Sequence, residues 1–211
     1  FRGERVYPTL LLDHHAAGRE DRRDDIFPNL EKLIDAAQRE IVIQNPYVIL
    51  TDRARAALKR ASERGVQLVL VTNSPVSSDS MPTQVFFVKE WKQLMADLPN
   101  LRILAAKVHR LQHSKVFVFD GRVTVIGSYN LDPLSDEVNS EEVAVVKSPE
   151  FGAQNRRHIL EDDAKNCLEY KVRIGTGGAV EQIYGPSDHV PAEALLRLEK
   201  LGTLSFLRPI I

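Results

Sequence analysis

The chain has 211 residues, of which 43% are hydrophobic and 27% charged, and this composition is typical of one globular domain with a sizeable core. Its 28 basic and 29 acidic residues nearly cancel, so the net charge does not favour a non-specific coat on nucleic acid, although it permits a local basic cleft. The single cysteine, Cys167, excludes an intramolecular disulfide framework and a cysteine-rich zinc site.

The first half of the chain alternates between strand and helix patterns. In order, we expect a strand at 6–12, a charged exposed connection at 13–25, a helix at 26–40, a strand at 41–45, a helix at 51–65, a strand at 66–74, a helix at 83–99 and a strand at 101–106. Thr51 is a candidate N-cap and Gly65 a candidate helix stop. Continuous apolar strands of this kind predict an α/β fold with a mixed, mainly parallel sheet flanked by helices.

The alternation of strands and helices ends in the second half of the chain. Asp120-Gly121 lies between two apolar runs and predicts a hairpin with a two-residue turn. A further strand at 141–146, a helix at 150–166, a two-stranded appendage and a final helix at 191–201 follow. We therefore predict one domain over residues 1–166 and a C-terminal extension over residues 167–211 that packs on it.

Four polar residues converge near the end of this hairpin that is remote from the turn. A two-residue turn would pair position 113 with position 128, and alternation would then place His113, Lys115, Ser128 and Asn130 on one face. A lone His-x-Lys would be read as the rim of an edge hairpin. Burying four such groups without partners costs about 1–3 kcal/mol each, so the cluster favours a polar ligand, while Asp120 at the turn suits a structural role.

Six fixed identities define a signature here, and they are His113-x-Lys115, Asp120 after four residues, and Gly127-Ser128-x-Asn130 after six more. This pattern resembles the HKD motif of the phospholipase D superfamily. The flanking segments 44–49, 64–79, 83–99 and 127–142 resemble bacterial cardiolipin synthases and their phospholipase D-like relatives. The resemblance covers about residues 25 to 160 and implies an α/β/α sandwich.

The resemblance implies phosphodiester chemistry without a metal or other cofactor. His113 would attack phosphorus and form a phosphohistidine, since the ordinary histidine pKa of about 6.5 makes a neutral ring available at neutral pH. Glu141, in the place of the family's acidic residue, would orient that ring as the acid of a hydrolase triad does. Lys115 and Asn130 would hold the phosphate oxygens.

Other residues take supporting places in this scheme. Ser128 would add a hydrogen bond, and Asp120 would organise the site rather than react. Glu142 is an alternative to Glu141 as the orienting acid, although only one of the two can share the face of His113, and Glu141 is favoured.

Further side chains are candidates for contact with substrate. Tyr47 and Asn73 follow strand ends, where α/β sheets bind ligands, although Asn-Ser at a strand end is also ordinary turn chemistry. His109 precedes the motif and Asn139 lies in a segment that matches the family. His14 and His15 lie in the charged connection and are expected to be solvated.

The motif occurs once, whereas an HKD site needs two, because a second histidine protonates the leaving oxygen. Two copies of the chain could supply both. The segment 127–142 instead resembles the second motif of two-motif proteins, and the chain starts at Phe1, so we expect a C-terminal half whose partner is a missing N-terminal HKD half.

The leading interpretation is phosphatidyl transfer of the cardiolipin synthase type on a phosphatidylglycerol-like phospholipid. The alternatives are a nuclease or phosphodiesterase acting on nucleic acid as a homodimer, which the charge disfavours, and a non-catalytic module for lipid binding or assembly. No apolar run has the length of a membrane span and no signal peptide is visible. We expect the complete protein to be membrane-associated and this chain to be soluble by itself.

Overall fold

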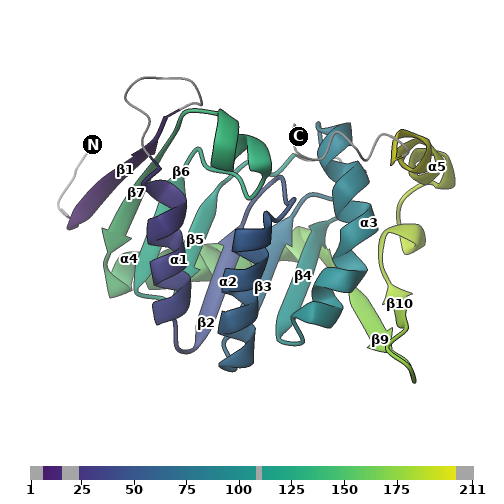
Figure 1. Ribbon diagram of the computed structural model, residues 1–211, viewed down its shortest axis with the longest axis horizontal. Helices are drawn as coiled ribbons and strands as arrows, with labels where there is room; N and C mark the ends of the chain where they lie inside the picture. Colours follow the sequence, from purple (N-terminus) through teal and green to yellow (C-terminus); the bar gives the residue numbers. More distant parts are fainter. Residues whose placement is uncertain (1–6, 16–23, 108–110, 203–211) are drawn as a thin grey trace.

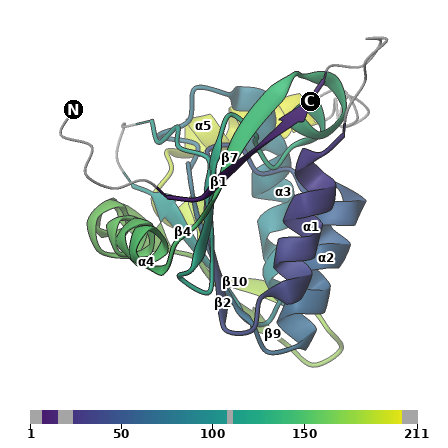
Figure 2. The ribbon, with the colours of Figure 1, turned by 90° about the vertical axis from the view of Figure 1, so that its left-hand side faces the viewer.

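The computed structural model of the chain describes residues 7–15, 24–107 and 111–202, and within them one large sheet lies between two layers of helices (Figures 1 and 2). Its eight strands lie in the order β1-β7-β6-β5-β2-β3-β4-β8. They are β1 (Thr9–His14), β2 (Glu40–Gln44), β3 (Gln67–Thr72), β4 (Leu101–Ala106), β5 (Val116–Phe119), β6 (Val123–Gly127), β7 (Glu141–Lys147) and β8 (Cys167–Glu169).

Helices cover both faces of this sheet. On one face lie α1 (Ile26–Ala36), α2 (Asp52–Glu63) and α3 (Met81–Asp97), and on the other lies α4 (Pro149–Arg157), as Figure 2 shows edge-on. After α4 the chain stays helical through a π-helical segment at His158–Asp163 and a 3-10 turn at Ala164–Asn166. The α/β/α sandwich predicted from the sequence is confirmed.

The sheet is mixed, but the expectation that it is mainly parallel is wrong. The neighbours β2–β3 and β3–β4 run parallel, whereas the other neighbouring pairs are antiparallel. The helical crossovers through α2 and α3 impose the parallel pairs, because a crossover returns the chain to the same edge. The β5–β6 hairpin and β7 then extend the sheet from β2 by short connections, which give antiparallel neighbours.

The apolar patterns of the helices produce the main core. Leu30 and Ile34 on α1 and Ala37 directly after it are buried, and so are Trp91 and Leu94 on α3. A second, smaller apolar cluster lies on the face of the sheet that carries α4, under the helical segments that follow it, and it contains Val42, Val69, Val71, Leu104, Val116, Val118 and Ile159. Because consecutive residues of a strand face opposite ways, the strands between these layers read as continuous apolar runs.

The α2 helix begins and ends where the sequence predicts. The hydroxyl oxygen of Thr51 accepts a hydrogen bond from the Ala54 N–H at 3.2 Å, which satisfies one of the free donors of the first turn. Gly65 has φ +83°, a left-handed conformation that favours glycine just past a helix end.

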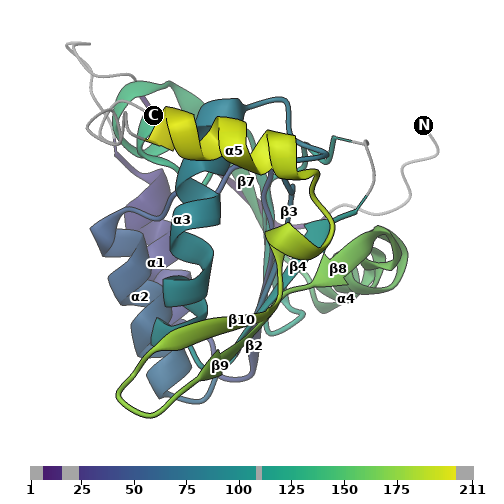
Figure 3. The same cartoon turned by 90° about the vertical axis from the view of Figure 1, so that its right-hand side faces the viewer.

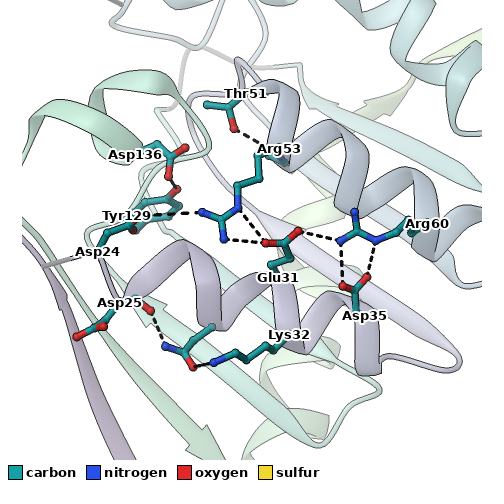
Figure 4. A network of polar contacts seen from close by, with 12 residues as sticks. Asp24, Asp25, Glu31, Lys32, Asp35, Thr51, Arg53, Arg60, Tyr129 and Asp136 are labelled. Atoms are coloured by element: carbon teal, nitrogen blue, oxygen red, sulfur yellow. Dashed lines mark hydrogen bonds and ion pairs between the residues drawn. The ribbon is translucent and has the colours of Figure 1, made fainter.

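Ion pairs join α1 to α2 on the outer surface, as Figure 4 shows. Arg53 and Arg60 of α2 both bind Glu31 of α1, with separations of 2.8 and 2.9 Å, and Arg60 also binds Asp35 at 2.9 Å. Each pair is partly exposed and contributes little alone, but together they set the two helices side by side.

The C-terminal residues are divided between the main sheet and a separate unit. The segment 167–174 is divided between two sheets, since β8 pairs with β4 at the edge of the main sheet and β9 (Lys171–Ile174) pairs instead with β10 (Val180–Tyr184). Between them Tyr170 is fully buried, with its ring 4.9 Å from that of Trp91. The last helix, α5 (Ala192–Leu201), lies against α3, as Figure 3 shows.

The turn of the β5–β6 hairpin differs from the prediction by one residue. Asp120 and Gly121 both have positive φ, of 53° and 66°, as a mirror-image turn requires. The expected pairing of 119 with 122 is nevertheless wrong, because Phe119 pairs with Val123. Arg122 therefore belongs to the connection.

A hydrogen bond to the segment after β7 accompanies the extra turn residue, Arg122. The Arg122 carbonyl oxygen accepts a hydrogen bond from the Ser148 N–H at 2.9 Å, which pairs Arg122 with the residue that directly follows β7. The register beyond it moves by one position, so Ser128 does not lie opposite His113. Ser128 instead meets the main chain of Glu142 on β7.

Candidate active site

The motif residues His113 and Lys115 lie directly before β5, beside Tyr47 in the chain that follows β2. The imidazole of His113 meets the Tyr47 ring edge-on, with centroids 5.7 Å apart, and the Lys115 Nζ lies 5.8 Å from the centroid of the same ring. His113 is exposed, whereas Lys115 is only 7% exposed and its Nζ donates to the His113 carbonyl oxygen at 3.0 Å. Both side chains therefore border one aromatic ring.

Burial lowers the pKa of Lys115, while the charges of Glu141, Asp132 and Asp79 oppose that shift. A buried ammonium with a single hydrogen bond to a carbonyl has further donors to offer. These donors, beside an exposed imidazole, suit an anionic ligand such as a phosphate group.

Glu141 is the buried acid of this cluster. It begins β7, is 8% exposed, and its Oε1 accepts hydrogen bonds from the Ser135 hydroxyl at 2.9 Å and from the Asn139 amide at 3.4 Å. Glu142 is exposed and points to the other face of the sheet. Of the two glutamates, only Glu141 lies where its charge acts on Lys115.

Asn130 is connected to Glu141 through Ser135. The Asn130 amide donates to the Ser135 hydroxyl at 3.4 Å, and that hydroxyl donates on to Glu141. The Asn130 Oδ1 is buried and has no hydrogen-bond partner within the part of the chain that the structure describes. An unpaired buried oxygen is costly, so this atom adds to the unmet polar capacity of the cluster.

Sequence reasoning missed Ser135 and Asp132. Ser135 is fully buried, and its N–H donates to the Asp132 Oδ1 at 2.8 Å. The spacing Asp-x-x-Ser is a local signal for this contact, because an aspartate often accepts from the N–H three residues later at the start of a helical turn. The reason for burying these two residues beside Glu141 is visible only in the fold.

Asp132 is 4% exposed and carries a perturbed carboxyl group. Burial, aided by the charge of Glu141, raises its pKa to about 6, against the hydrogen bonds from Ser135 and the charge of Lys115. Two carboxylates and one lysine thus share a poorly solvated space, which is common at functional sites.

Asp120 lies at the opposite end of the hairpin. Its carboxylate accepts main-chain hydrogen bonds from Gln38 at 3.1 Å, from Arg39 at 2.8 Å and from Glu40 at 3.1 Å. Although burial acts to raise the pKa of Asp120, these N–H groups lower it overall. The motif aspartate therefore ties the hairpin turn to the α1–β2 connection.

Gly127 and Ser128 join the end of β6 to β7. A Cβ on Gly127 would lie 2.1 Å from the Glu142 carbonyl oxygen, so only glycine permits this approach. The Ser128 N–H donates to the same carbonyl at 3.0 Å, and the Ser128 hydroxyl accepts from the Glu142 N–H at 3.0 Å. These contacts hold the start of β7, where Glu141 lies.

The substrate-contact candidates have different environments. The Tyr47 hydroxyl donates to Asp79 at 2.6 Å, and its ring borders His113. Asn73 is fully buried, and its amide pairs with both main-chain groups of Gln112 at 2.9 and 3.0 Å, which positions the chain just before His113. Asn139 is exposed apart from its bond to Glu141, and His109 lies outside the described residues.

The expectation that His14 and His15 are solvated is wrong. His14 is 1% exposed, ends β1 and lies opposite Glu141 in the β1–β7 ladder. Its Nδ1 is 3.5 Å from the Asp24 carboxylate, and the partly buried His15 ring contacts Asp13 at 2.9 Å. Strand pairing with β7 extends β1 past its apolar run, which buries a histidine that the sequence alone places in a charged loop.

The described ranges contain neither a cluster of metal ligands nor a helix that could span a membrane. Within residues 7–15, 24–107 and 111–202, no group of three or more histidine, cysteine or acidic residues is arranged to hold a metal ion. In the same ranges, every helix is too short or too polar to cross a bilayer.

The mixed α/β/α sandwich and the histidine–lysine cluster at the open end of its hairpin define a phospholipase D-like domain. The chain belongs to this family, because the family model for the "Cardiolipin synthase, PLD-like domain" matches residues 30–162. Cardiolipin synthase B of Shigella flexneri is 29% identical over 153 residues, which are 71% of this chain and 35% of that protein. An uncharacterized protein of Helicobacter pylori is 29% identical over 159 residues, which are 68% of this chain and 31% of that protein. The chain thus spans about a third of the length of these relatives.

Two solved structures share the fold. Phosphatidylserine synthase from Haemophilus influenzae superimposes with a TM-score of 0.67 and 13% identity, over 96% of this chain and 48% of that one. The phospholipase D family member Nuc from Salmonella typhimurium gives a TM-score of 0.60 and 18% identity, over 78% of this chain and 99% of that one. At these identities the likeness establishes the fold alone.

Proposed function

We propose that this chain supplies one half of a phospholipase D-type site that transfers phosphatidyl groups through a phosphohistidine. One observation carries the proposal: an exposed imidazole, His113, lies beside the buried ammonium of Lys115, and a buried hydrogen-bonded glutamate, Glu141, lies in the same cluster. A nucleophile, a cation for phosphate oxygens and an orienting acid are the groups that this chemistry needs.

In the first step a ring nitrogen of His113 attacks phosphorus. The N–P bond forms as the P–O bond to the leaving alcohol breaks, and that oxygen takes a proton from an acid in the second half-site. In the second step an incoming hydroxyl gives its proton to the same group and attacks phosphorus, and the N–P bond breaks. Lys115 and Asn130 would stabilise the charge on the non-bridging oxygens in both steps.

Glu141 would orient His113 in this scheme. Its carboxylate would accept a hydrogen bond from the ring N–H that does not react, which fixes the tautomer and stabilises the positive ring of the intermediate. The bonds from Ser135 and Asn139 hold the carboxylate in one position. Asn73, through Gln112, and Asp120, through the α1–β2 connection, would fix the two ends of the motif.

A phospholipid is the substrate class that we favour. The family model and the relatives carry the name of cardiolipin synthase, and the 28 basic and 29 acidic residues give no general attraction for nucleic acid. Transfer to an alcohol would give an anionic lipid of the cardiolipin type, and transfer to water would give phosphatidic acid.

The second half-site comes from outside this chain in our proposal. The relatives are about three times as long as the matched region, which is compatible with a first half in the same polypeptide, and a second copy of the chain is the other source. Light scattering after size exclusion separates them, since a dimer of this chain supports the second source.

The test replaces His113 with alanine in the complete protein that contains both halves. We expect phosphatidylglycerol turnover to fall by at least roughly a thousandfold, and a radiolabelled phosphoryl-enzyme to disappear. Arg173→Ala is the control, because Arg173 pairs with Glu181 on the exposed β9–β10 unit. Retained turnover in His113→Ala would exclude His113 as the nucleophile. Cleavage of single-stranded DNA without lipid turnover would replace the lipid proposal, and a lack of both activities in the unaltered protein would favour a non-catalytic module.

A further inference from the structure

The C-terminal unit of β9, β10 and α5 lies beside α3 (Figure 3), and His189 joins this unit to the main domain. His189 directly follows the 3-10 turn Pro186–Asp188, and its Nε2 is 3.0 Å from the Tyr170 hydroxyl. Tyr170 is fully buried, and its N–H donates to the Ile103 carbonyl oxygen of β4 at 2.9 Å. The contact between His189 and Tyr170 therefore connects the C-terminal unit to the main sheet.

The surroundings of His189 suit an uncharged ring. Its centroid is 5.7 Å from that of the Tyr170 ring and 6.4 Å from that of the Tyr184 ring. Its Nδ1 is buried and has no hydrogen-bond partner among the described residues. A neutral ring can donate from Nε2 to the Tyr170 oxygen and carry no hydrogen on Nδ1. A protonated ring has a hydrogen on Nδ1 as well, so it would bury a charged donor without an acceptor, which costs more free energy.

The charged groups near this ring do not offset that cost. Burial lowers the pKa of His189, and the charge of the neighbouring Asp188 opposes this shift. The Asp188 carboxylate accepts hydrogen bonds from the Gly185 N–H at 2.8 Å and from the Gln182 amide at 2.7 Å. The charged residues that line the adjoining cavity on α3 and α5 are Lys89, Lys92 and Glu199. Carboxylates and ammonium groups ordinarily keep their charges between pH 5 and pH 7.5, whereas a histidine titrates in this range.

We propose that His189 is a pH-sensitive switch, which holds the C-terminal unit against α3 when its ring is neutral and loosens this contact when its ring is protonated. Because the pKa of the docked histidine is lowered, docking is strongest above the ordinary histidine pKa of about 6.5. As the pH falls from there through the lower docked value, docking weakens by up to about tenfold per pH unit for one proton. The switch is separate from the phosphodiester site and does not depend on the proposed function.

Hydrogen exchange of this chain, followed by mass spectrometry at pH 7.5 and pH 5, tests the switch. After correction for intrinsic chemical exchange, the rate in segment 180–190 should rise about tenfold at pH 5, while the rate in the central strands β2 and β3 should not change. A second signal comes from Trp91, which is the only tryptophan of the chain and is 1% exposed. A Cβ on Gly185 would lie 2.5 Å from its ring, so loosening of this contact should increase acrylamide quenching of Trp91 at pH 5.

His189→Gln removes the titration and keeps a side chain that can pair with the Tyr170 hydroxyl, so its corrected exchange rate should be the same at both pH values. His158→Gln is the matched control, because His158 is exposed and pairs with Asp162 on the segment after α4, and it should keep the tenfold difference. Equal corrected rates at pH 7.5 and pH 5 in the native protein would overturn the proposal without any variant. A pH dependence that persists in folded His189→Gln protein would overturn it as well.

Discussion

The two ends of the β5–β6 hairpin place aspartates in opposite circumstances. At the turn, Asp120 accepts hydrogen bonds from the main chain of three consecutive residues, and its pKa is lowered despite burial. Near the open end, Asp132 receives one main-chain hydrogen bond at 2.8 Å beside Glu141, and burial raises its pKa to about 6.

The comparison shows how polar residues divide between structure and function. Where every charge is matched by donors from the chain, as at Asp120, the residue stabilises the fold. At the open end the Asn130 Oδ1 has no hydrogen-bond partner among the described residues, the Lys115 ammonium makes one described hydrogen bond, and two carboxyl groups lie close together. Groups left unmet in the protein alone are those that a ligand can satisfy.

Among the changes that test this comparison, Lys115→Met should give the largest effect. The change keeps the length of the side chain and removes its charge, so kcat in the complete protein should fall about 10²–10³-fold. Burial lowers the pKa of Lys115, which means that its charged form costs stability at neutral pH, so the melting temperature should not fall. Lys59→Met on the exposed side of α2 is the control. Lost folding together with lost activity would place Lys115 with Asp120 as a structural residue.

Asp120→Asn should instead reduce stability. Asparagine tolerates the positive φ and keeps one acceptor oxygen, but hydrogen bonds to a neutral oxygen are weaker, so unfolding should become easier by about 1–2 kcal/mol at pH 7, and solvent screening favours the lower end. Because the folded pKa is lowered, this stability is present above the ordinary carboxyl pKa and is lost as the pH falls through the folded value. Urea unfolding at pH 7 and pH 3 measures the difference in free energy of unfolding between the native protein and the variant. An equal difference at both pH values would contradict the prediction.

Asp132→Asn should instead raise the free energy of unfolding at pH 7. The folded pKa of about 6 lies above the ordinary value of 3.8, so the native protein loses stability as the pH rises from about 4 to about 6. Asparagine keeps the acceptor for the Ser135 N–H and does not ionise, so the variant should be more stable at pH 7, on the order of 2 kcal/mol. Thermal unfolding across this pH range is the measurement. If the variant is less stable than the native protein at pH 7, the Asp132 carboxylate is stabilised by its surroundings and the prediction is wrong.

Local patterns were sufficient for several features. Alternation of apolar runs and helix signals predicted the layers, Thr51 and Gly65 predicted the bounds of α2, and Asp120-Gly121 predicted the hairpin. These features depend on residues close in the chain, where propensity and capping act directly. The motif spacing predicted the family because it is a property of the sequence itself.

Other features depended on contacts between distant segments. The hairpin register moved by one residue because Ser148 binds the Arg122 carbonyl, and His14 became buried because β1 pairs with β7 as far as Glu141. The strand β8 pairs with β4 at the edge of the main sheet, outside the two-stranded appendage that the sequence predicts. No local pattern contains these long-range pairings, since each needs a partner strand in place.

By itself, the sequence determined the elements, the hairpin and the signature that places this chain among phospholipase D-like domains, because periodicity and motif spacing are local. Only the tertiary structure decided that the Asp120 carboxylate is matched by main-chain donors while burial raises the pKa of Asp132, and that Ser135 joins Asn130 to Glu141. Burial and hydrogen-bond pairing are properties of the assembled layers. They distinguish polar residues that stabilise the fold from polar residues that can bind a ligand.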